Sequence, residues 1–221
     1  MYKVKLENLI RGLLILFALG VLCFNIIEMS SNIHAKQGKI YVLEALSGIL
    51  LIFVPEALEK IFSLKFTRSI IYFYWLFLWL SIYLGTCLQF MSRMEFWDKL
   101  LHVTSPILLT MVGYGVIGAF LNETDKTNIS PMLFIIFGFA FAALCGVLWE
   151  FWEFGWDGIG NMNLQRYLQN GKPLIGRKAL FDTMGDLLAN TVGAVIIAVY
   201  TGIKSKNDAN YFERYKIKSI K

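Results

Sequence analysis

The chain has 221 residues, of which 57% are hydrophobic and only 17% are charged, and its formal net charge is +5. An ordinary soluble domain has roughly 45–50% apolar and about 25% charged residues, and a fold of this size has too little interior for the excess. The composition therefore excludes a soluble protein. Lys and Arg lie between apolar segments rather than in one stripe, which argues against a nucleic-acid-binding protein.

Six apolar segments are each long enough to cross a hydrocarbon core about 30 Å thick. In chain order they cover approximately residues 8–28, 40–62, 68–90, 98–120, 131–154 and 181–202. We interpret the first as a retained helix, because its apolar run is longer than that of a signal peptide. The sequence predicts an all-α fold, a polytopic bundle of six transmembrane helices over 1–202, with a basic cytoplasmic tail over 203–221.

Local signals mark two of these helices. Pro55 lies inside the second segment, where it predicts a kink or an early end. The fifth segment begins with Ser130 as an N-cap and Pro131 at the first helical position. Between the fifth and sixth segments lies the longest connection, 155–180, which is rich in glycine. Long connections are often functional, so a lid and a plain surface loop both remain open.

The distribution of basic residues predicts the orientation. One side of the membrane carries 13 Lys and Arg, including Lys126 and Lys221, and the other carries 8. The positive-inside rule then places both termini in the cytoplasm of a cell-membrane protein.

Polar residues recur at helical spacing in the last three segments, each group on one helix face. They are Asp98 and His102 in the fourth segment, Glu150, Glu153 and Asp157 in the fifth, and Asp182, Asp186 and Asn190 in the sixth. The fifth segment carries its group at its end and the other two carry theirs at the start. All three groups are therefore expected near one membrane face, and Glu44 of the second segment at a similar depth.

Rows of small residues indicate how these helices pack. The fifth segment has Gly138, Ala142 and Gly146 on the row of Glu150, and the sixth has Gly193 on a comparable row. Small residues at this spacing allow helices to approach closely in lipid. We therefore expect the fifth and sixth segments to pack against each other and to bring their acidic residues together.

The acidic residues cannot all stay ionised together at the membrane boundary. Protonation, the neighbouring bases Lys99, Arg177 and Lys178, or a bound cation would compensate their charge. Oxygen ligands with a single imidazole suit a divalent ion such as Mg²⁺, Mn²⁺, Fe²⁺ or Zn²⁺. The ligands expected for such an ion are Asp98, His102, Glu150, Asp186 and Asn190.

These motifs resemble a known family. The stretches Trp97 to His102, Trp149 to Asp157 and Asp182 to Ala194 resemble the YjdF-type family of bacterial membrane proteins. Over the last three segments they are also similar to the VanZ-like family, although Glu153 stands where that pattern has Gln. The resemblance implies a polytopic bacterial membrane protein, and it maps family motifs onto Asp98, Lys99, His102, Glu150, Arg177, Asp186, Asn190 and Gly193.

Three functions fit this pattern. The first is a metal-dependent hydrolase or transferase that acts on a lipid-linked or cell-envelope substrate, with Glu153 or Asp182 as general base and Lys99 and Arg177 contacting substrate. The second is a proton- or cation-coupled transporter that uses the same acidic residues. The third is a non-catalytic membrane scaffold. The pattern does not specify the substrate or the oligomeric state.

Overall fold

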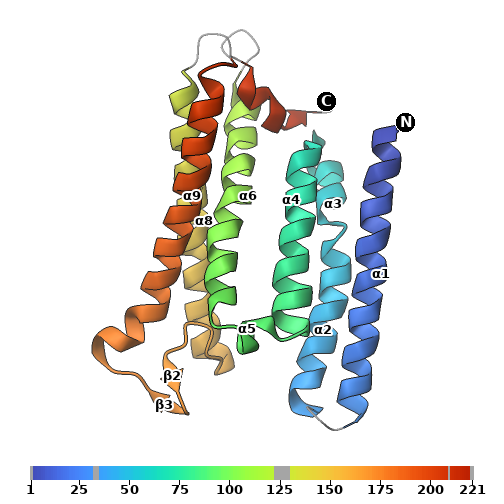
Figure 1. Ribbon diagram of the computed structural model, residues 1–221, viewed down its shortest axis with the longest axis vertical. Helices are drawn as coiled ribbons and strands as arrows, with labels where there is room; N and C mark the ends of the chain where they lie inside the picture. Colours follow the sequence, from blue (N-terminus) through green and yellow to red (C-terminus); the bar gives the residue numbers. More distant parts are fainter. Residues whose placement is uncertain (1, 32–34, 122–129, 209, 220–221) are drawn as a thin grey trace. The chain divides into compact units, whose positions relative to one another are not determined.

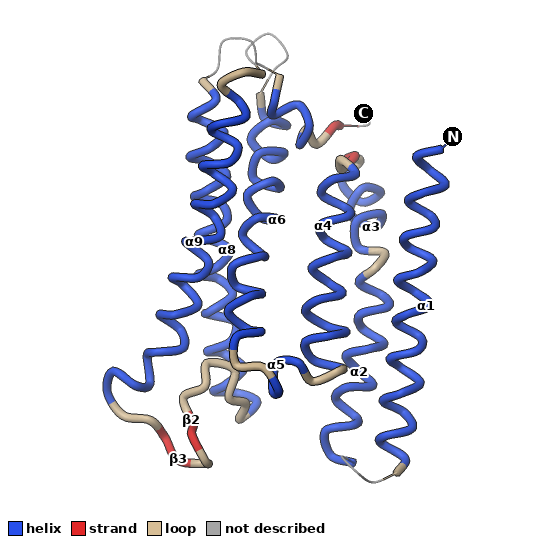
Figure 2. Tube along the Cα trace, viewed as in Figure 1, coloured by secondary structure: helices blue, strands red, loops and turns tan. Residues whose placement is uncertain are grey.

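The computed structural model describes residues 2–31, 35–121, 130–208 and 210–219, and helices dominate it (Figure 2). Its helices are α1 Tyr2–Ser30, α2 Ala35–Leu51, α3 Val54–Phe62, α4 Arg68–Leu78, the π-helix η1 Trp79–Cys87, α5 Phe90–Arg93, α6 Phe96–Phe120, α8 Pro131–Gly160, the 3₁₀ helices η2 Gly176–Leu180 and η3 Tyr211–Tyr215, and α9 Phe181–Ser205. Its short strands are β1 Leu64–Lys65, β2 Leu168–Gln169, β3 Lys172–Pro173 and β4 Lys218–Ser219. Lys126 and Lys221 of the charge count lie outside the described residues.

The predicted all-α membrane architecture is confirmed. Among the described residues, five helices are long and apolar enough to cross a membrane: Leu6–Ser30, Arg68–Cys87, Phe96–Phe120, Pro131–Gly160 and Gly176–Ser205. A bent pair, Gln37–Leu51 with Val54–Phe62, gives a sixth if it counts as one span. The six predicted segments therefore all correspond to helices.

Contacts within the chain divide it into two units (Figure 1). The first unit runs to Leu101 and includes β4, and the second covers His102–Ile217. The boundary falls inside α6, so this helix contributes its first turn to the first unit. In the first unit α1 packs along α2, and α2 packs along η1.

The bend between α2 and α3 confirms the interruption predicted at Pro55. The two helices meet at 46°, and the proline occupies the first turn of α3. Backbone carbonyls that the bend frees are satisfied by aromatic side chains of α4. Tyr74 donates its hydroxyl to the oxygen of Leu51 at 2.7 Å, and Trp75 donates its indole N–H to that of Ile52 at 3.0 Å. The interruption is therefore stabilised from within the first unit.

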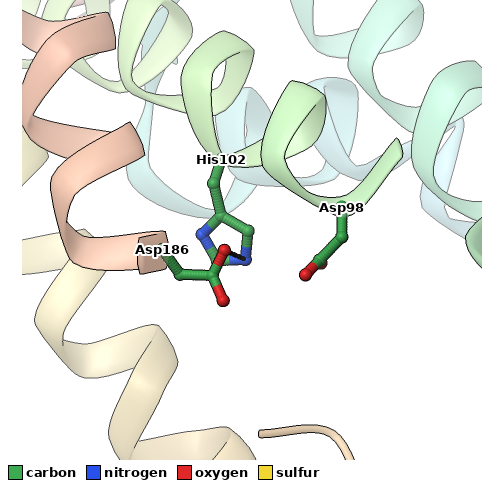
Figure 3. A group of neighbouring side chains, drawn as sticks. All are labelled: Asp98, His102 and Asp186. Atoms are coloured by element: carbon green, nitrogen blue, oxygen red, sulfur yellow. Dashed lines mark ion pairs between the residues drawn. The ribbon is translucent and has the colours of Figure 1, made fainter. Parts of the chain in front are cut away.

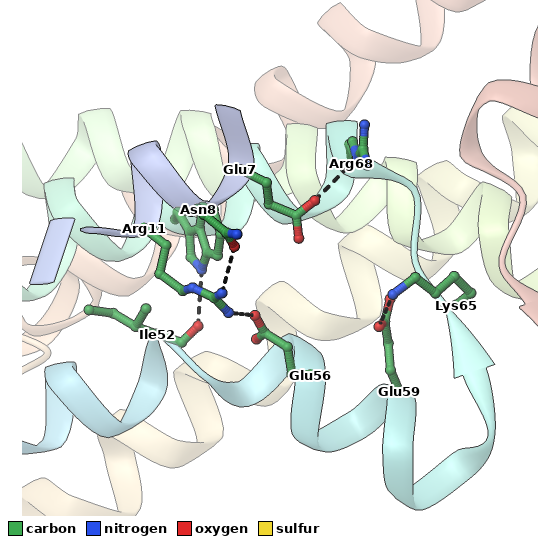
Figure 4. A network of polar contacts seen from close by, with 9 residues as sticks. Glu7, Asn8, Arg11, Ile52, Glu56, Glu59, Lys65 and Arg68 are labelled. Atoms are coloured by element: carbon green, nitrogen blue, oxygen red, sulfur yellow. Dashed lines mark hydrogen bonds and ion pairs between the residues drawn. The ribbon is translucent and has the colours of Figure 1, made fainter. Parts of the chain in front are cut away.

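Ion pairs tie α1, α3 and α4 together around this bend (Figure 4). Arg11 of α1 pairs with Glu56 of α3, and Glu7 of α1 lies 3.2 Å from Arg68 of α4. Charges inside a membrane bundle are costly unless they are paired. The pairing thus explains how these charged residues are accommodated in an otherwise apolar unit.

In the second unit α6, α8 and α9 lie side by side, with the start of α6, the end of α8 and the start of α9 at one end (Figure 1). The common end predicted for their polar groups is therefore confirmed. The predicted packing of the fifth segment on the sixth is confirmed as well, because α8 and α9 contact each other extensively. The other end of this unit is covered by η3, whose Tyr211, Phe212 and Tyr215 are buried.

The helix α8 continues to Gly160, beyond the boundary expected at 154. Gly155 and Gly158 belong to the predicted connection, but both are helical although glycine is a poor helix former. The connection is shorter than expected for that reason. Between Asn161, in the left-handed conformation after α8, and η2 it contains the antiparallel hairpin β2–β3.

Candidate functional site

Helices α6 and α9 bring together a compact group of three ligand-type side chains (Figure 3). Asp98 and His102 lie one turn apart on α6, and Asp186 projects from α9 toward the imidazole. One ligand atom of each lies within 4.8 Å of the other two, and Nε2 of His102 is 3.6 Å from Oδ1 of Asp186. The three residues are between 1% and 6% exposed, so the group is shielded from solvent.

Close helix contacts fix the distance between the two halves of this group. A Cβ atom built on Gly193 would overlap the carbonyl oxygen of Val103, the residue after His102, and would lie 3.0 Å from its carbonyl carbon. Only glycine allows the backbones of α9 and α6 to come this near. The row of small residues that includes Gly193 is predicted to pack on α8. In the structure, Gly193 packs on α6 instead.

Glu150 of α8 and Asn190 of α9 are two further predicted metal ligands that are buried. Glu150 is 3% exposed and lies within electrostatic range of His102 and Asp182, with Thr183 beside it. Asn190, 4% exposed, lies against Gly146, where a Cβ would come 2.7 Å from Nδ2 of the amide. Glu150 does not belong to the compact group of Asp98, His102 and Asp186. Their predicted role as metal ligands stays a prediction.

The connection after α8 folds back over these acidic residues. The carboxylate of Asp157 accepts hydrogen bonds from the backbone N–H groups of Leu164 at 2.6 Å and Gln165 at 3.0 Å. The side chain of Gln165 then donates to Glu150, at 3.2 Å from Oε2 and 3.3 Å from the backbone oxygen. These bonds show that Asp157 holds the loop over Glu150, and the choice between a lid and a plain surface loop stays a prediction.

Sequence reasoning missed Gln165 and Arg166. Nη1 of Arg166 lies 3.8 Å from Oδ1 of Asp182, and the arginine adopts a left-handed backbone conformation with φ 48°. Helical spacing identified the acidic residues, but a residue in an irregular loop has no spacing that would identify its partner. A lone polar side chain 15 positions after Glu150 carried no recognisable signal.

The remaining predicted residues occupy different surroundings. Glu153 is buried and accepts the indole N–H of Trp149 at 2.9 Å. Lys99 lies 3.5 Å from Asp98, while Arg177 is exposed on η2. Glu44 is half-buried on α2, in the first unit. Asp182 is half-buried one turn before Asp186 on α9.

The group has the chemistry of a divalent cation site. Two carboxyl groups supply oxygen ligands, and an imidazole supplies a borderline nitrogen ligand. Ligands that bind one ion at about 2.1 Å lie at most about 4.2 Å apart, so these atoms would close on an ion with a shift of less than about 1 Å. Three protein ligands leave coordination positions for water or substrate, as in catalytic metal sites.

Fold and site together define a polytopic helical membrane protein with a buried aspartate–histidine–aspartate group. The chain belongs to the DUF2238 family, described as predicted membrane proteins, whose family model matches residues 10–207. This membership is consistent with the resemblance to the YjdF-type family. The similarity to the VanZ-like family stays a prediction.

No curated protein and no solved structure matches the chain. The site must therefore be interpreted from its own chemistry. The cytoplasmic location of the termini also stays a prediction.

Proposed function

We propose that the protein is a metal-dependent membrane hydrolase or transferase that acts on a lipid-linked or cell-envelope substrate. The observation that carries the proposal is the buried group formed by Asp98, His102 and Asp186, whose ligand atoms lie within 4.8 Å of one another. Buried acidic residues in membrane helices are costly, and they mark functional sites by default. A divalent cation would compensate the two carboxylates and polarise a bound oxygen or water.

Position favours Asp182 over Glu153 as the general base in this proposal. Asp182 precedes Asp186 by one turn of α9 and acts electrostatically on Glu150. Glu153 is engaged by the indole of Trp149. Arg166, which lies 3.8 Å from Asp182, joins Lys99 and Arg177 as a basic residue that would contact a phosphate or another anion of the substrate.

The test is the metal content of the detergent-purified protein, measured by mass spectrometry without exposure to chelators. We expect near-stoichiometric divalent metal in the wild type and its loss in Asp186→Asn and His102→Gln. Asp208→Asn is the matched control, because Asp208 forms an exposed ion pair with Arg214 in the C-terminal segment. A metal-free wild type, or metal retained by both site variants, would refute the proposal.

One observation favours a transporter as the second candidate. The bent pair α2–α3 resembles the discontinuous helices on which transporters build ion sites. The carbonyls of Leu51 and Ile52 at the bend already accept hydrogen bonds from Tyr74 and Trp75, however, which lowers their value as ion ligands. Cation or proton flux in proteoliposomes, absent from the Asp186→Asn variant, would support this candidate over the enzyme.

A further inference from the structure

We propose that Glu150 and Asn190 recognise the substrate rather than the metal, and that the substrate headgroup carries a hydroxyl next to a phosphate. This inference rests on the proposed function, because it assigns the two residues beside the proposed ion. It separates the predicted ligands into two sets. The compact group holds the ion, and the pair formed by Glu150 and Asn190 contacts the organic part of the substrate.

The first supporting observation concerns Glu150. Its Oε2 accepts a hydrogen bond from Gln165 at 3.2 Å, and Thr183 lies beside the carboxylate, whereas Oε1 is buried and has no hydrogen-bond partner of its own among the described residues. A buried acceptor without a donor is costly, and more so when it is charged. An oxygen kept in this state in a fold is therefore suited to accept a donor from a ligand, such as a hydroxyl.

The second observation is independent and concerns Asn190. Its Nδ2 is also buried and has no hydrogen-bond partner within the described parts of the chain. The amide lies over Gly146, one turn before Glu150 on α8, so the unpartnered donor lies near the level of the unpartnered acceptor. Asn190 follows Asp186 by one turn on α9. The pair thus offers one acceptor and one donor beside the proposed ion.

The loop explains why one oxygen of Glu150 is left for a ligand. Asp157 fixes the backbone of Gln165, and the amide of Gln165 bonds both the backbone oxygen and Oε2 of Glu150. The bond to the backbone oxygen anchors the amide on α8, and the bond to Oε2 orients the carboxylate. Gln165 is therefore a positioning residue, which acts on the substrate through Glu150.

The chemistry of this pair selects the substrate class. A carboxylate oxygen accepts a hydroxyl hydrogen, and a neutral amide N–H donates to a phosphoryl oxygen without adding charge. The divalent ion would supply the positive charge that a phosphate needs. A headgroup such as glycerol phosphate can bond to the carboxylate, the amide and the ion. An alkyl phosphate lacks the hydroxyl, and a simple alcohol lacks the phosphate.

The experiment compares glycerol phosphate with propyl phosphate as probes. Binding to the full-length protein in detergent is measured by calorimetry, in the presence and absence of Mn²⁺. A hydrogen bond to a charged group corresponds to at least about tenfold in affinity. We therefore expect the wild type to prefer glycerol phosphate by about tenfold or more, and Glu150→Gln to lose most of this preference while it still binds Mn²⁺.

Two further variants separate the roles. Asn190→Leu should weaken both probes by a similar factor, because the phosphate is common to them. Gln165→Ala should reduce the preference for glycerol phosphate without changing Mn²⁺ affinity, and Asp208→Asn should change nothing. If Asn190→Leu binds both probes as the wild type does, the role of Asn190 is refuted.

The outcomes distinguish this inference from the proposed function. Equal affinity of the wild type for the two probes would overturn the inference even if Mn²⁺ binds. Loss of Mn²⁺ from Glu150→Gln would overturn it as well, because Glu150 would then be a metal ligand. A wild type that binds no Mn²⁺ but still prefers glycerol phosphate would refute the metal-dependent function and support the recognition pair.

Discussion

Gly193→Ala tests the close approach of α9 to α6 on which the candidate site depends. The new methyl group would overlap the carbonyl oxygen of Val103 and lie 3.0 Å from its carbonyl carbon and 3.2 Å from its Cα. All three are backbone atoms, so no side-chain rotation can relieve the overlap. The two helices would have to separate locally by about 1 Å, which is an overpacking of the kind that costs about 1–3 kcal/mol.

For a chain of this length, each kcal/mol corresponds to roughly 2–4 °C in the thermal midpoint. We therefore expect Gly193→Ala to lower the midpoint by roughly 2–12 °C, measured by intrinsic tryptophan fluorescence in detergent. Because Val103 follows His102, the separation should also weaken metal binding. Gly202→Ala on the same helix is the matched control, since its Cβ would meet only Ile135 Cδ1 at an ordinary 3.5 Å.

Alanine is the better helix former by about 1 kcal/mol, so the control should be neutral or slightly stabilised. If Gly193→Ala is as stable as Gly202→Ala and retains its metal, the backbone contact does not exist as described. The dependence of the site on that contact would then be refuted.

Three further predictions concern local contacts. Trp75→Phe should cost about 1–3 kcal/mol in thermal unfolding, because it leaves the carbonyl of Ile52 without its donor. Ser130→Ala should cost about 1 kcal/mol, since Ser130 caps α8 by accepting the N–H of Met132; an unchanged midpoint would contradict either prediction. Burial and the neighbouring tyrosines raise the pKa of Tyr215 above its ordinary 10.0, so its stabilising contribution is complete below pH 10 and declines at higher pH. Tyr215→Phe should flatten this alkaline decline in stability, and a curve as steep as that of the wild type would contradict the assignment.

The fold could be predicted from the sequence because membrane helices are specified by local properties. Apolar runs set the spans, and single residues set their interruptions, as the bend at Pro55 and the cap at Ser130 show. The predicted end of α8, at residue 154, was wrong for a physical reason. Gly155 and Gly158 disfavour a helix locally, but in the extended helix Asp157 lies on the buried face and accepts the backbone N–H groups of Leu164 and Gln165.

Periodicity predicted which polar side chains share a helix face and which end of the bundle they occupy. Asp98 and His102 share a face of α6, and Asp186 was assigned to the same end of the bundle, so their meeting follows from helix geometry. Helix geometry could not indicate that Gly193 contacts α6 rather than α8. The rotation of each helix about its axis is set by the packing of all three.

The loop residues lie beyond sequence prediction for a different reason. Gln165 and Arg166 reach the acidic residues through an irregular path that depends on Asp157 and on left-handed conformations at Asn161 and Arg166. Such a path is stabilised only when the completed helices present Asp157 and Glu150 to it. The conformation of the loop therefore depends on the packed helices and cannot be predicted from the loop sequence alone.

The proposed ion site depends on the distance between α6 and α9. Substitutions that change this distance should therefore weaken metal binding even at residues that do not contact the ion. Asp98 and His102 are held at a fixed separation by one turn of α6, so only Asp186 moves when α9 shifts. The 3.6 Å between His102 and Asp186 is maintained by the glycine contact nearer the centre of the bundle. A change at Gly193 should therefore affect metal binding more than an equally destabilising change elsewhere. Trp75→Phe, in the first unit, should lower stability by a similar amount and leave the metal in place.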